Sequence, residues 1–391
     1  MKYQLIKDIN SNYNTIETIL TNRGIKKEEI EHYLNTTDKD INEPELLGEE
    51  NLKAAAVQLI RTISVGDPAL VVVDCDCDGF TSAAILMNYL HKIFPSWVEN
   101  KLYYYLHENK AHGLEDCIDW ITERYFPLII VPDAGSNDYA YHKKLKEQGR
   151  TVIVLDHHLA DHISKDAIII NNQLSNYPNK ELSGAGVVWQ FCRFLDKKMK
   201  ITNYADDLID LVALGLMADM QSMLSFETKH LIQKGFKNEN LKNPFIDGIA
   251  KKNAYSLGDK ITPMGAAFYI APFVNAMVRS GTLEEKQLLF KSMLSWEAFK
   301  NILSTKRGHS LGEEETLVTQ ALRVATNVKN RQTRAQDAAM ELVEHEIEDN
   351  HMMEHKVLLF LLEPGLIDKN IARFMCKQIN GKISKTCLYF N

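Results

Sequence analysis

The 391-residue chain contains no run of 18 apolar residues, and its opening stretch, MKYQLIKDINSN, lacks the apolar centre of a signal peptide. These absences favour a soluble, cytoplasmic protein. Six cysteines are too few for a disulfide scaffold in a chain of this length. Cys75 and Cys77 form a C-x-C, but no second Cys/His pair supplies zinc-finger spacing, which argues against a structural zinc site.

The chain also lacks an excess of positive charge. Its formal net charge is −7, which argues against a uniformly basic nucleic-acid-binding surface. A local basic groove remains compatible with this net charge, because the clustered carboxylates of a metal site would make the total more negative. The net charge therefore does not identify the substrate. There is no internal repeat, and a hydrophobic content of 45% over this length predicts two or more domains.

Short apolar runs alternate with helical patterns through the first half of the chain. The predicted strands cover 69–73, 128–131, 151–155 and 168–170. The predicted helices cover 82–93, 139–148, 187–198 and 204–217. Nearly all-apolar strands that alternate with helices are typical of a parallel sheet covered on both faces. We therefore predict an α/β fold with a parallel sheet flanked by helices.

Outside this region the sequence changes character. Apolar residues have helical spacing in the first 65 residues, lysines become frequent after about residue 225, and 313–348 has neither Pro nor Gly. This last stretch predicts a connecting helix or a long surface helix, and the apolar run from Val357 favours the first because it opens a new unit. We predict five segments: a helical N-terminal segment (1–65), the α/β core (66–225), a helical, Lys-rich extension of the core (226–310), a long connecting helix (311–350) and the start of a second α/β domain (351–391).

Three of the predicted strands end in acids or imidazoles. The first runs into Asp74-Cys-Asp-Cys-Asp78, the second ends at Asp133, and the third ends in Asp156-His157-His158. Functional groups of an open parallel sheet collect beyond the carboxyl ends of its strands, so these side chains are expected to meet. While the first strand lasts, alternation places its three aspartates on one side and the two cysteines on the other.

Carboxylates spaced two residues apart repel one another, by roughly 4 kcal/mol per pair at about 4 Å and an effective dielectric near about 20. A bound divalent cation removes this repulsion, and carboxylates with one or two imidazoles suit Mn²⁺ or Mg²⁺. Turn chemistry explains a lone strand-end aspartate or His pair, but hardly three such endings on one sheet. The constellation therefore predicts a metal centre of the kind that hydrolyses phosphoesters with a pair of ions.

Two further stretches are weaker signals. Leu211 to Asp219 is an apolar helix that ends in an acid, which fits a further ligand or a core helix with an ordinary capping residue equally well. Ser183 and Gly184 precede a predicted helix, whose N-terminal amides could bind an anion. Close packing of the helix start explains these small residues at least as well.

Together these motifs resemble the DHH phosphoesterase superfamily, which is named for the Asp-His-His found here at 156–158. Four of its motifs occur in order: DCDCDG at 74–79, VPDAG at 131–135, DHH at 156–158 and the helix-borne acid of MAD at 219. The resemblance implies two Mn²⁺ or Mg²⁺ ions. By motif position it implies these ligands: Asp76 for the first ion, Asp78, His157 and Asp219 for the second, and Asp133 between them.

The same resemblance implies two catalytic residues. His158 would lie beside the substrate phosphate, and Asp74 fits the extra acid of a RecJ-type D-x-D-x-D-G motif. Many relatives carry a His four residues before the Asp76 position, where this chain has Val72. The first metal site is therefore expected to be weaker, or to be completed by Asp74.

Within the superfamily, two stretches resemble the RecJ-type single-strand DNA exonucleases. Asn22-Arg-Gly-Ile resembles their nRGi segment, and 270–279 resembles an APRxNAxGR segment in which Phe273 and Val278 depart from the pattern. His112-Gly-Leu resembles a YGL, but His107 stands where an Arg is expected upstream. The resemblance implies these substrate-binding residues: Asn275, Arg279, Ser183, Gly184 and His112.

The end of the chain resembles the opening of the family's second domain, DHHA1, without its later GGGH segment and without an OB-fold. We therefore expect distributive digestion of a single strand, unless a protein partner supplies the missing C-terminal half. The predicted connecting helix offers basic residues for the strand, namely Arg323, Lys329, Arg331 and Arg334.

Three functions remain open. The first is 5′–3′ exonuclease action on single-stranded DNA, and the second is phosphodiester hydrolysis of short oligonucleotides or cyclic dinucleotides. The third is a DNA- or partner-binding subunit with reduced catalysis. The complete set of metal-motif acids argues against the third, and the 22–25 and 270–279 segments favour the first over the second.

Overall fold

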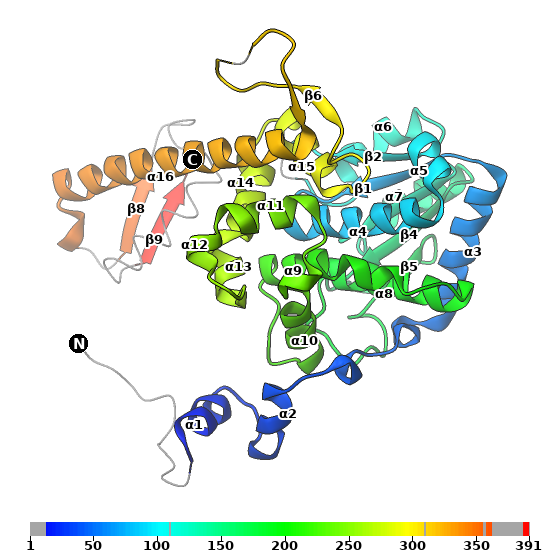
Figure 1. The fold of residues 1–391 in the computed structure, drawn as a ribbon, viewed down its shortest axis with the longest axis horizontal. Coiled ribbons are helices and arrows are strands. Elements are labelled where there is room, and N and C mark those ends of the chain that lie inside the picture. The colour runs from blue at the N-terminus through cyan, green and yellow to red at the C-terminus, as the bar shows by residue number, and fades with distance from the viewer. Residues whose placement is uncertain (1–12, 109–110, 309, 355–356, 362–385, 391) are drawn as a thin grey trace.

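The computed structural model describes residues 13–108, 111–308, 310–354, 357–361 and 386–390. At its centre lies a parallel five-stranded sheet in the order β2-β1-β3-β4-β5 (Figure 1). The strands are β1 (Ala69–Val73), β2 (Leu102–Leu106), β3 (Leu128–Pro132), β4 (Thr151–Asp156) and β5 (Ile168–Asn171). The predicted α/β class and all four predicted strands are confirmed.

Strand β2 is not predicted by the hydrophobic pattern. It is the run Leu102-Tyr-Tyr-Tyr-Leu106, which follows α5 (Pro95–Lys101) without an intervening turn signal. It lies at the edge of the sheet and pairs only with β1, so Tyr103 remains half exposed. The three central residues of β2 are tyrosines that are not fully buried, so β2 lacks the continuous aliphatic run that reveals the other four strands.

Alternate residues of the strands enter two hydrophobic cores. On one face, residues such as Val71 and Ile130 pack with α4 (Cys77–Ile93), α8 (Gly184–Met199) and α9 (Ile209–Ala218). On the other face, residues such as Leu70 and Ile129 pack with α6 (Ile118–Thr122) and α7 (Tyr139–Glu147). The sheet is therefore covered on both sides, as its apolar strands predict.

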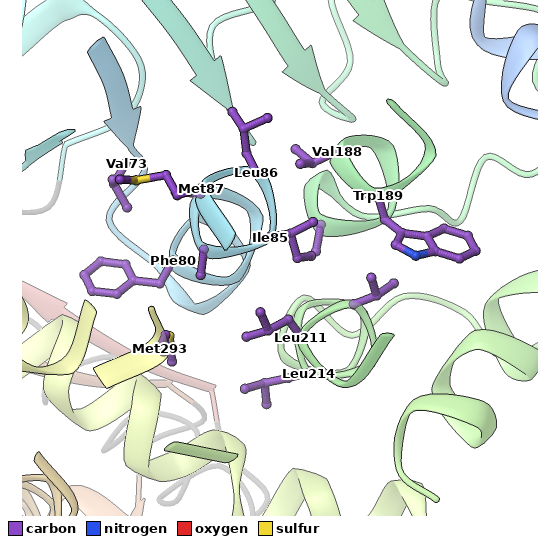
Figure 2. Packing of buried hydrophobic residues seen from close by; sticks show 14 of the residues in the cluster. Val73, Phe80, Ile85, Leu86, Met87, Val188, Trp189, Leu211, Leu214 and Met293 are labelled. Atoms are coloured by element: carbon purple, nitrogen blue, oxygen red, sulfur yellow. The ribbon is translucent and has the colours of Figure 1, made fainter. Parts of the chain in front are cut away.

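Helix α4 is the most deeply buried helix of this arrangement, since every residue from Cys77 to Leu90 is buried. Figure 2 shows its side chains reaching in several directions: Leu86 toward the sheet, Ile85 toward α8 and Phe80 away from α8. A helix that is apolar on all sides belongs inside a core. Its position fixes the first turn of α4 beside the strand ends, where the predicted acids lie.

The N-terminal segment is helical in its described part, with α1 (Thr15–Asn22), α2 (Ile30–Leu34) and α3 (Glu49–Val65). Residues 1–12 lie outside the described residues. The buried Glu227 of α10 (Phe226–Gly235) accepts hydrogen bonds from the backbone amide and the side chain of Asn42, at 2.9 and 2.8 Å. This contact ties the N-terminal segment to the helices that follow the sheet.

The residues after α10 are also mainly helical. The further helices are α11 (Pro244–Lys252), α12 (Ala254–Leu257), α13 (Pro263–Tyr269), α14 (Ala271–Ser280) and α15 (Leu283–Met293). A hairpin of β6 (Asn301–Leu303) and β7 (Glu314–Thr316) follows. None of the described helices is both long enough and apolar enough to cross a membrane.

Helix α16 spans Leu317–Asp349 and is about 50 Å long at about 1.5 Å per residue. It begins later than the predicted 313 because the preceding residues pair with β6 and Thr316 caps the helix. It packs on α11, α14 and α15 and extends toward the end of the molecule where β8 (Val357–Leu361) pairs with β9 (Thr386–Phe390) (Figure 1). The strand predicted at 357 is confirmed, while residues 362–385 lie outside the described part and the five segment boundaries stay predictions.

Candidate metal centre

The carboxyl ends of β1, β3 and β4 bring the predicted acids and imidazoles together, as a parallel sheet requires. At β1 the local geometry differs from the prediction. The strand ends at Val73, and Asp76 is the N-cap of α4, where it accepts a hydrogen bond from the Gly79 amide at 2.9 Å. The expected strand alternation of three aspartates is therefore wrong, because the chain turns into a helix within the motif.

Asp78 lies in the first turn of α4 and is held by the start of α8. Its buried carboxylate accepts hydrogen bonds from the Ser183 hydroxyl at 2.9 Å, the Gly184 amide at 2.7 Å and the Ala185 amide at 3.2 Å. Amides at a helix N-terminus stabilise an anion, and here that anion is a side chain of the protein itself. The donors of Ser183 and Gly184 are thus engaged with Asp78, and their contact with substrate stays a prediction.

Asp133 follows β3 in an unusual conformation. Its φ of +64° is left-handed, which is uncommon for a residue other than glycine. Its amide donates to the Leu155 carbonyl at 2.8 Å, while its buried Oδ1 atom has no hydrogen-bond partner. A Cβ at Gly184 would lie 2.2 Å from that oxygen, so the helix start must be glycine to come this close. The His157 ring nitrogen 3.3 Å from this oxygen is itself a possible metal ligand, so a buried carboxylate oxygen without a hydrogen bond fits contact with a cation here.

The three residues of the Asp-His-His motif differ in their partners. Asp156 Oδ1 accepts the amides of His157 and His158 and lies 2.7 Å from His158 Nδ1, while Oδ2 accepts the Ser136 amide at 3.0 Å. Burial alone would raise the pKa of Asp156, but the hydrogen bond and charge of His158 bring it below its ordinary value. The same hydrogen bond raises the pKa of His158 to about 9, so the ring is an imidazolium with Nε2 left for another partner.

His157 faces the acids. Its Nε2 atom lies 3.3 Å from Asp133 Oδ1, 3.6 Å from Asp219 Oδ2 and 3.8 Å from Asp78 Oδ2. Asp219 is the C-cap of α9, and the Gln221 side chain donates a hydrogen bond to it. The end of an apolar core helix is thereby fixed at the centre. Asp219 both caps this helix and lies beside His157, and its role as a ligand stays a prediction.

Three overlapping groups of side chains could hold a cation, with ligand atoms within 4.8 Å of one another in each group. The groups are Asp74, Asp76 and Asp133; Asp78, His157 and Asp219; and Asp133, His157 and His158. All residues predicted as metal ligands or catalytic groups therefore meet at one place. Asp133 belongs to two groups, which fits its expected position between two ions.

Electrostatic repulsion within the centre also fits bound cations. Burial, followed by the charges of Asp74 and Asp78, raises the pKa of Asp76 to about 6. Burial and neighbouring aspartates also raise the pKa values of Asp133 and Asp219. Oxygen ligands with one or two imidazoles are the donor set that Mn²⁺ and Mg²⁺ accept, and either ion would remove the repulsion.

Residues 68–216 match the model of the DHH family, N-terminal domain. This part of the chain belongs to the DHH family. The whole chain is 34% identical over 390 residues to YorK, a protein of Bacillus subtilis strain 168 named as an SPbeta prophage-derived single-strand DNA-specific exonuclease. The alignment covers 99% of this chain and 65% of YorK, so the chain spans about two thirds of the length of that relative.

The chain is also similar to proteins named RecJ. The single-stranded-DNA-specific exonuclease RecJ of Bacillus subtilis is 28% identical over 295 residues, which cover 73% of this chain and 35% of that protein. A crystal structure of exonuclease RecJ bound to manganese superposes with a TM-score of 0.68 at 19% identity, over 87% of this chain and 79% of that one. RecJ from Thermus thermophilus with Mn²⁺ gives 0.66 at 19% identity, over 87% and 46%. The fold of this chain is therefore the fold of these proteins.

His112, a predicted substrate-binding residue of the DHH domain, lies beside Asp74 and His158. Its Nδ1 atom is 3.0 Å from Asp74 Oδ1, and its ring centroid is 4.8 Å from that of His158. The hydrogen bond to Asp74 raises the pKa of His112. The imidazoles of His112 and His158, whose pKa values are both raised, thus lie beside the acids of the centre.

Asn275 and Arg279 lie on α14, which packs against α4 and α9. Burial raises the pKa of Cys77 and nearby aspartates raise it further, whereas the charge of Arg279 lowers it. Arg279 is therefore within electrostatic reach of the first turn of α4. Helix α14 borders the centre, but neither of the two residues belongs to the three cation groups.

Three basic residues of α16 make contacts within the protein. Arg323 pairs with Glu315, Arg331 lies 2.8 Å from Glu285, and the Lys329 ammonium lies 4.2 Å above the ring of Phe273. These contacts hold α16 against the hairpin, α14 and α15. The contact of Arg323, Lys329, Arg331 and Arg334 with a DNA strand stays a prediction.

Several residues that support the centre escape the sequence reasoning. Asn171, at the end of β5, donates hydrogen bonds to Ser136 Oγ at 2.8 Å and to the His158 carbonyl at 2.9 Å. The strand-end rule, applied to the fourth predicted strand as to the other three, would have found it. Gly215 of α9 lies where a Cβ would be 2.3 Å from Asp78 Oδ1, and a glycine in an apolar helix gives no such signal.

Proposed function

We propose that this chain is a metal-dependent phosphodiesterase that removes nucleotides from single-stranded DNA in the 5′–3′ direction. The observation that carries the proposal is the convergence of two ligand groups at the carboxyl end of the sheet, where Asp133 of the first group lies 3.3 Å from His157 of the second. The relatives named as single-strand DNA-specific exonucleases support the substrate class. The RecJ structures with Mn²⁺ and with Mg²⁺ support the choice of ions.

The ligand groups support two ion positions. Asp74, Asp76 and Asp133 would hold one ion, and Asp78, His157 and Asp219 would hold the other. Asp133 lies 3.3 Å from His157 and would therefore reach both ions. When bound, such a pair supplies a water of lowered pKa and neutralises phosphate oxygens. The start of α8 holds Asp78 and Gln221 holds Asp219, so the ligands are oriented before any substrate arrives.

The remaining residues act on the phosphate. His158 is held by Asp156 through Nδ1, which leaves Nε2 to donate to a phosphate oxygen and to stabilise charge that develops during cleavage. Asn275 and Arg279 of α14, together with His112, would bind phosphates of the strand. An Arg–phosphate contact is charge-assisted and can be bidentate, so Arg279 is expected to contribute most to binding.

A second candidate is hydrolysis of short oligonucleotides or cyclic dinucleotides by the same centre. The contacts of Arg323, Lys329 and Arg331 within the protein favour it, because side chains that pair internally neutralise fewer phosphates of a long strand.

The cytoplasmic location and a protein partner that adds DNA contacts stay predictions.

Relative rates on three substrates separate these candidates. With Mn²⁺ present, the protein is given a long single strand labelled at either end, a dinucleotide and cyclic di-AMP. We expect the long strand to be cleaved fastest, from its 5′ end, and EDTA to abolish cleavage. A preference for the dinucleotide or cyclic di-AMP would identify the second candidate, and full activity in EDTA would exclude the mechanism.

An Asp133→Asn variant tests the shared ligand. It should lose more activity than a change at any other ligand and should bind less Mn²⁺, because Asp133 supplies a carboxylate to the first group and lies 3.3 Å from His157 of the second. Asp119→Asn is the matched control, since Asp119 is exposed and pairs with Lys144 on the surface. Equal activity of the two variants would show that Asp133 is not shared between ions.

A further inference from the structure

Asp138 occupies the N-cap position of α7, but its side chain does not cap that helix. An aspartate at this position ordinarily accepts a hydrogen bond from an amide two or three residues further on. Here Oδ2 accepts the amide of Leu114 instead, at 2.8 Å. The carboxylate therefore links the loop after β3 to the loop after β2.

The linked backbone is the part of the loop that follows His112. Gly113 has a left-handed φ of +67°, and a Cβ there would lie 2.3 Å from Asp138 Oδ2. Leu114 is fully buried in the smaller of the two cores. The Asp138 carboxylate thus packs against a turn that requires glycine. Because His112 directly precedes this turn, the turn fixes the orientation of His112.

Asp138 is itself fixed to the metal centre. Its amide donates to the Gly135 carbonyl at 3.0 Å, within the turn that follows Asp133. At the other end of the linkage, His112 Nδ1 lies 3.0 Å from Asp74, and its ring meets that of His158. One side chain therefore connects the turn after the shared ligand with an imidazole on the far side of the centre.

We propose that Asp138 is a positioning residue that holds His112 against Asp74 and His158 by fixing the Gly113–Leu114 turn. The proposal rests on the proposed phosphodiesterase function, in which His112 contacts the substrate. Asp138 does not touch the substrate, so it acts only through His112. Removal of Asp138 should then reproduce the loss of His112.

A double-mutant cycle tests this dependence. Asp138→Ala and His112→Ala should each lower kcat/KM on single-stranded DNA by about tenfold, and the double variant should be no slower than His112→Ala alone. Additive losses in the double variant would overturn the proposal. Asp119→Ala is the matched control, because Asp119 also reaches α7, through Lys144 at 3.2 Å, and should leave kcat/KM unchanged.

Two further variants distinguish positioning from general destabilisation. Asp138→Asn keeps an oxygen that can accept the Leu114 amide, and it should retain most activity. Gly113→Ala forces the turn away from the carboxylate and should reproduce Asp138→Ala with the carboxylate present. Full activity of Gly113→Ala would contradict the proposed linkage.

The position of His112 can also be measured without activity. In the ¹⁵N-histidine-labelled protein with Mg²⁺, the imidazole ¹⁵N resonances of His112 should shift in Asp138→Ala but not in Asp119→Ala. An unchanged His112 spectrum would overturn the positioning role, even if the enzyme is active. Absence of cleavage of every phosphodiester by the wild type would refute the proposed function and leave this spectroscopic result to decide the linkage.

Discussion

Replacing Gly215 by alanine tests how closely α9 is packed against the metal ligands. In an ordinary helix interior this change stabilises the helix by about 1 kcal/mol. The structure predicts the opposite. A Cβ at this position would lie 2.3 Å from Asp78 Oδ1, 2.6 Å from the Ala185 Cβ and 2.7 Å from the Thr81 hydroxyl. All of these atoms belong to buried residues, so none can move into solvent.

The expected loss of stability follows from the displacement of Asp78 and its neighbours by the added methyl group. Overpacking a core costs about 1–3 kcal/mol, and each hydrogen bond lost from the charged Asp78 adds about 1.5–3 kcal/mol. Even one such loss outweighs the helix gain of about 1 kcal/mol, so we expect Gly215→Ala to lower the free energy of unfolding by about 1.5–5 kcal/mol. Because Asp78 is a proposed ligand, Mn²⁺ affinity should fall by at least about tenfold, or about 1.4 kcal/mol.

Gly265→Ala supplies the matched control within the same protein. Gly265 is also helical, in α13, but its Cβ would meet only the Leu257 Cδ2 methyl at 3.0 Å and the Thr262 hydroxyl at 3.3 Å. Denaturant unfolding and Mn²⁺ titration of both variants measure the two effects. If Gly215→Ala were as stable as Gly265→Ala and bound Mn²⁺ with wild-type affinity, the close approach of α9 to Asp78 would be wrong.

Three further predictions concern the phosphate contacts and the charge of the centre. His158→Ala should lower kcat by about 100-fold or more while Mn²⁺ content stays near that of the wild type, because His158 stabilises charge on the phosphate; loss of metal in step with activity would instead make it a ligand. Arg279→Ala should raise KM for single-stranded DNA and reduce the slope of log affinity against log salt by nearly one unit, and an unchanged slope would leave Arg279 a structural role. The pKa of Asp76 is raised to about 6, so the metal-free folded state keeps a proton that the unfolded chain releases near its ordinary value. The free energy of unfolding of the metal-free protein should therefore fall as pH rises from about 4 to about 6, by at most about 3 kcal/mol from this group; stability that rises over this range in EDTA would contradict the repulsion.

The sequence determined the elements whose signal is local. Continuous apolar runs reveal β1, β3, β4 and β5, because strands buried on both faces leave no room for polar residues. Acids and imidazoles at three of these strand ends predict a shared site, since parallel strands all finish at one edge of the sheet. The roles of the individual ligands, Asp219 of α9 among them, come from the resemblance to the DHH superfamily and not from this rule.

Only the tertiary structure decided how those residues are held. Asp78 accepts the hydrogen bonds that the start of α8 donates. Ser183, one of these donors, is 105 residues away from Asp78 in the sequence, and no local pattern encodes such a pairing. Strand β2 and the contacts of the α16 cations likewise depend on the neighbours that the fold provides. The left-handed turn at Asp133 and the glycine at 215 serve contacts between elements distant in sequence. The close packing of such elements determines which donor contacts which carboxylate. A buried polar atom is stabilised by a hydrogen bond, and its partner can come from any part of the chain that the fold brings next to it.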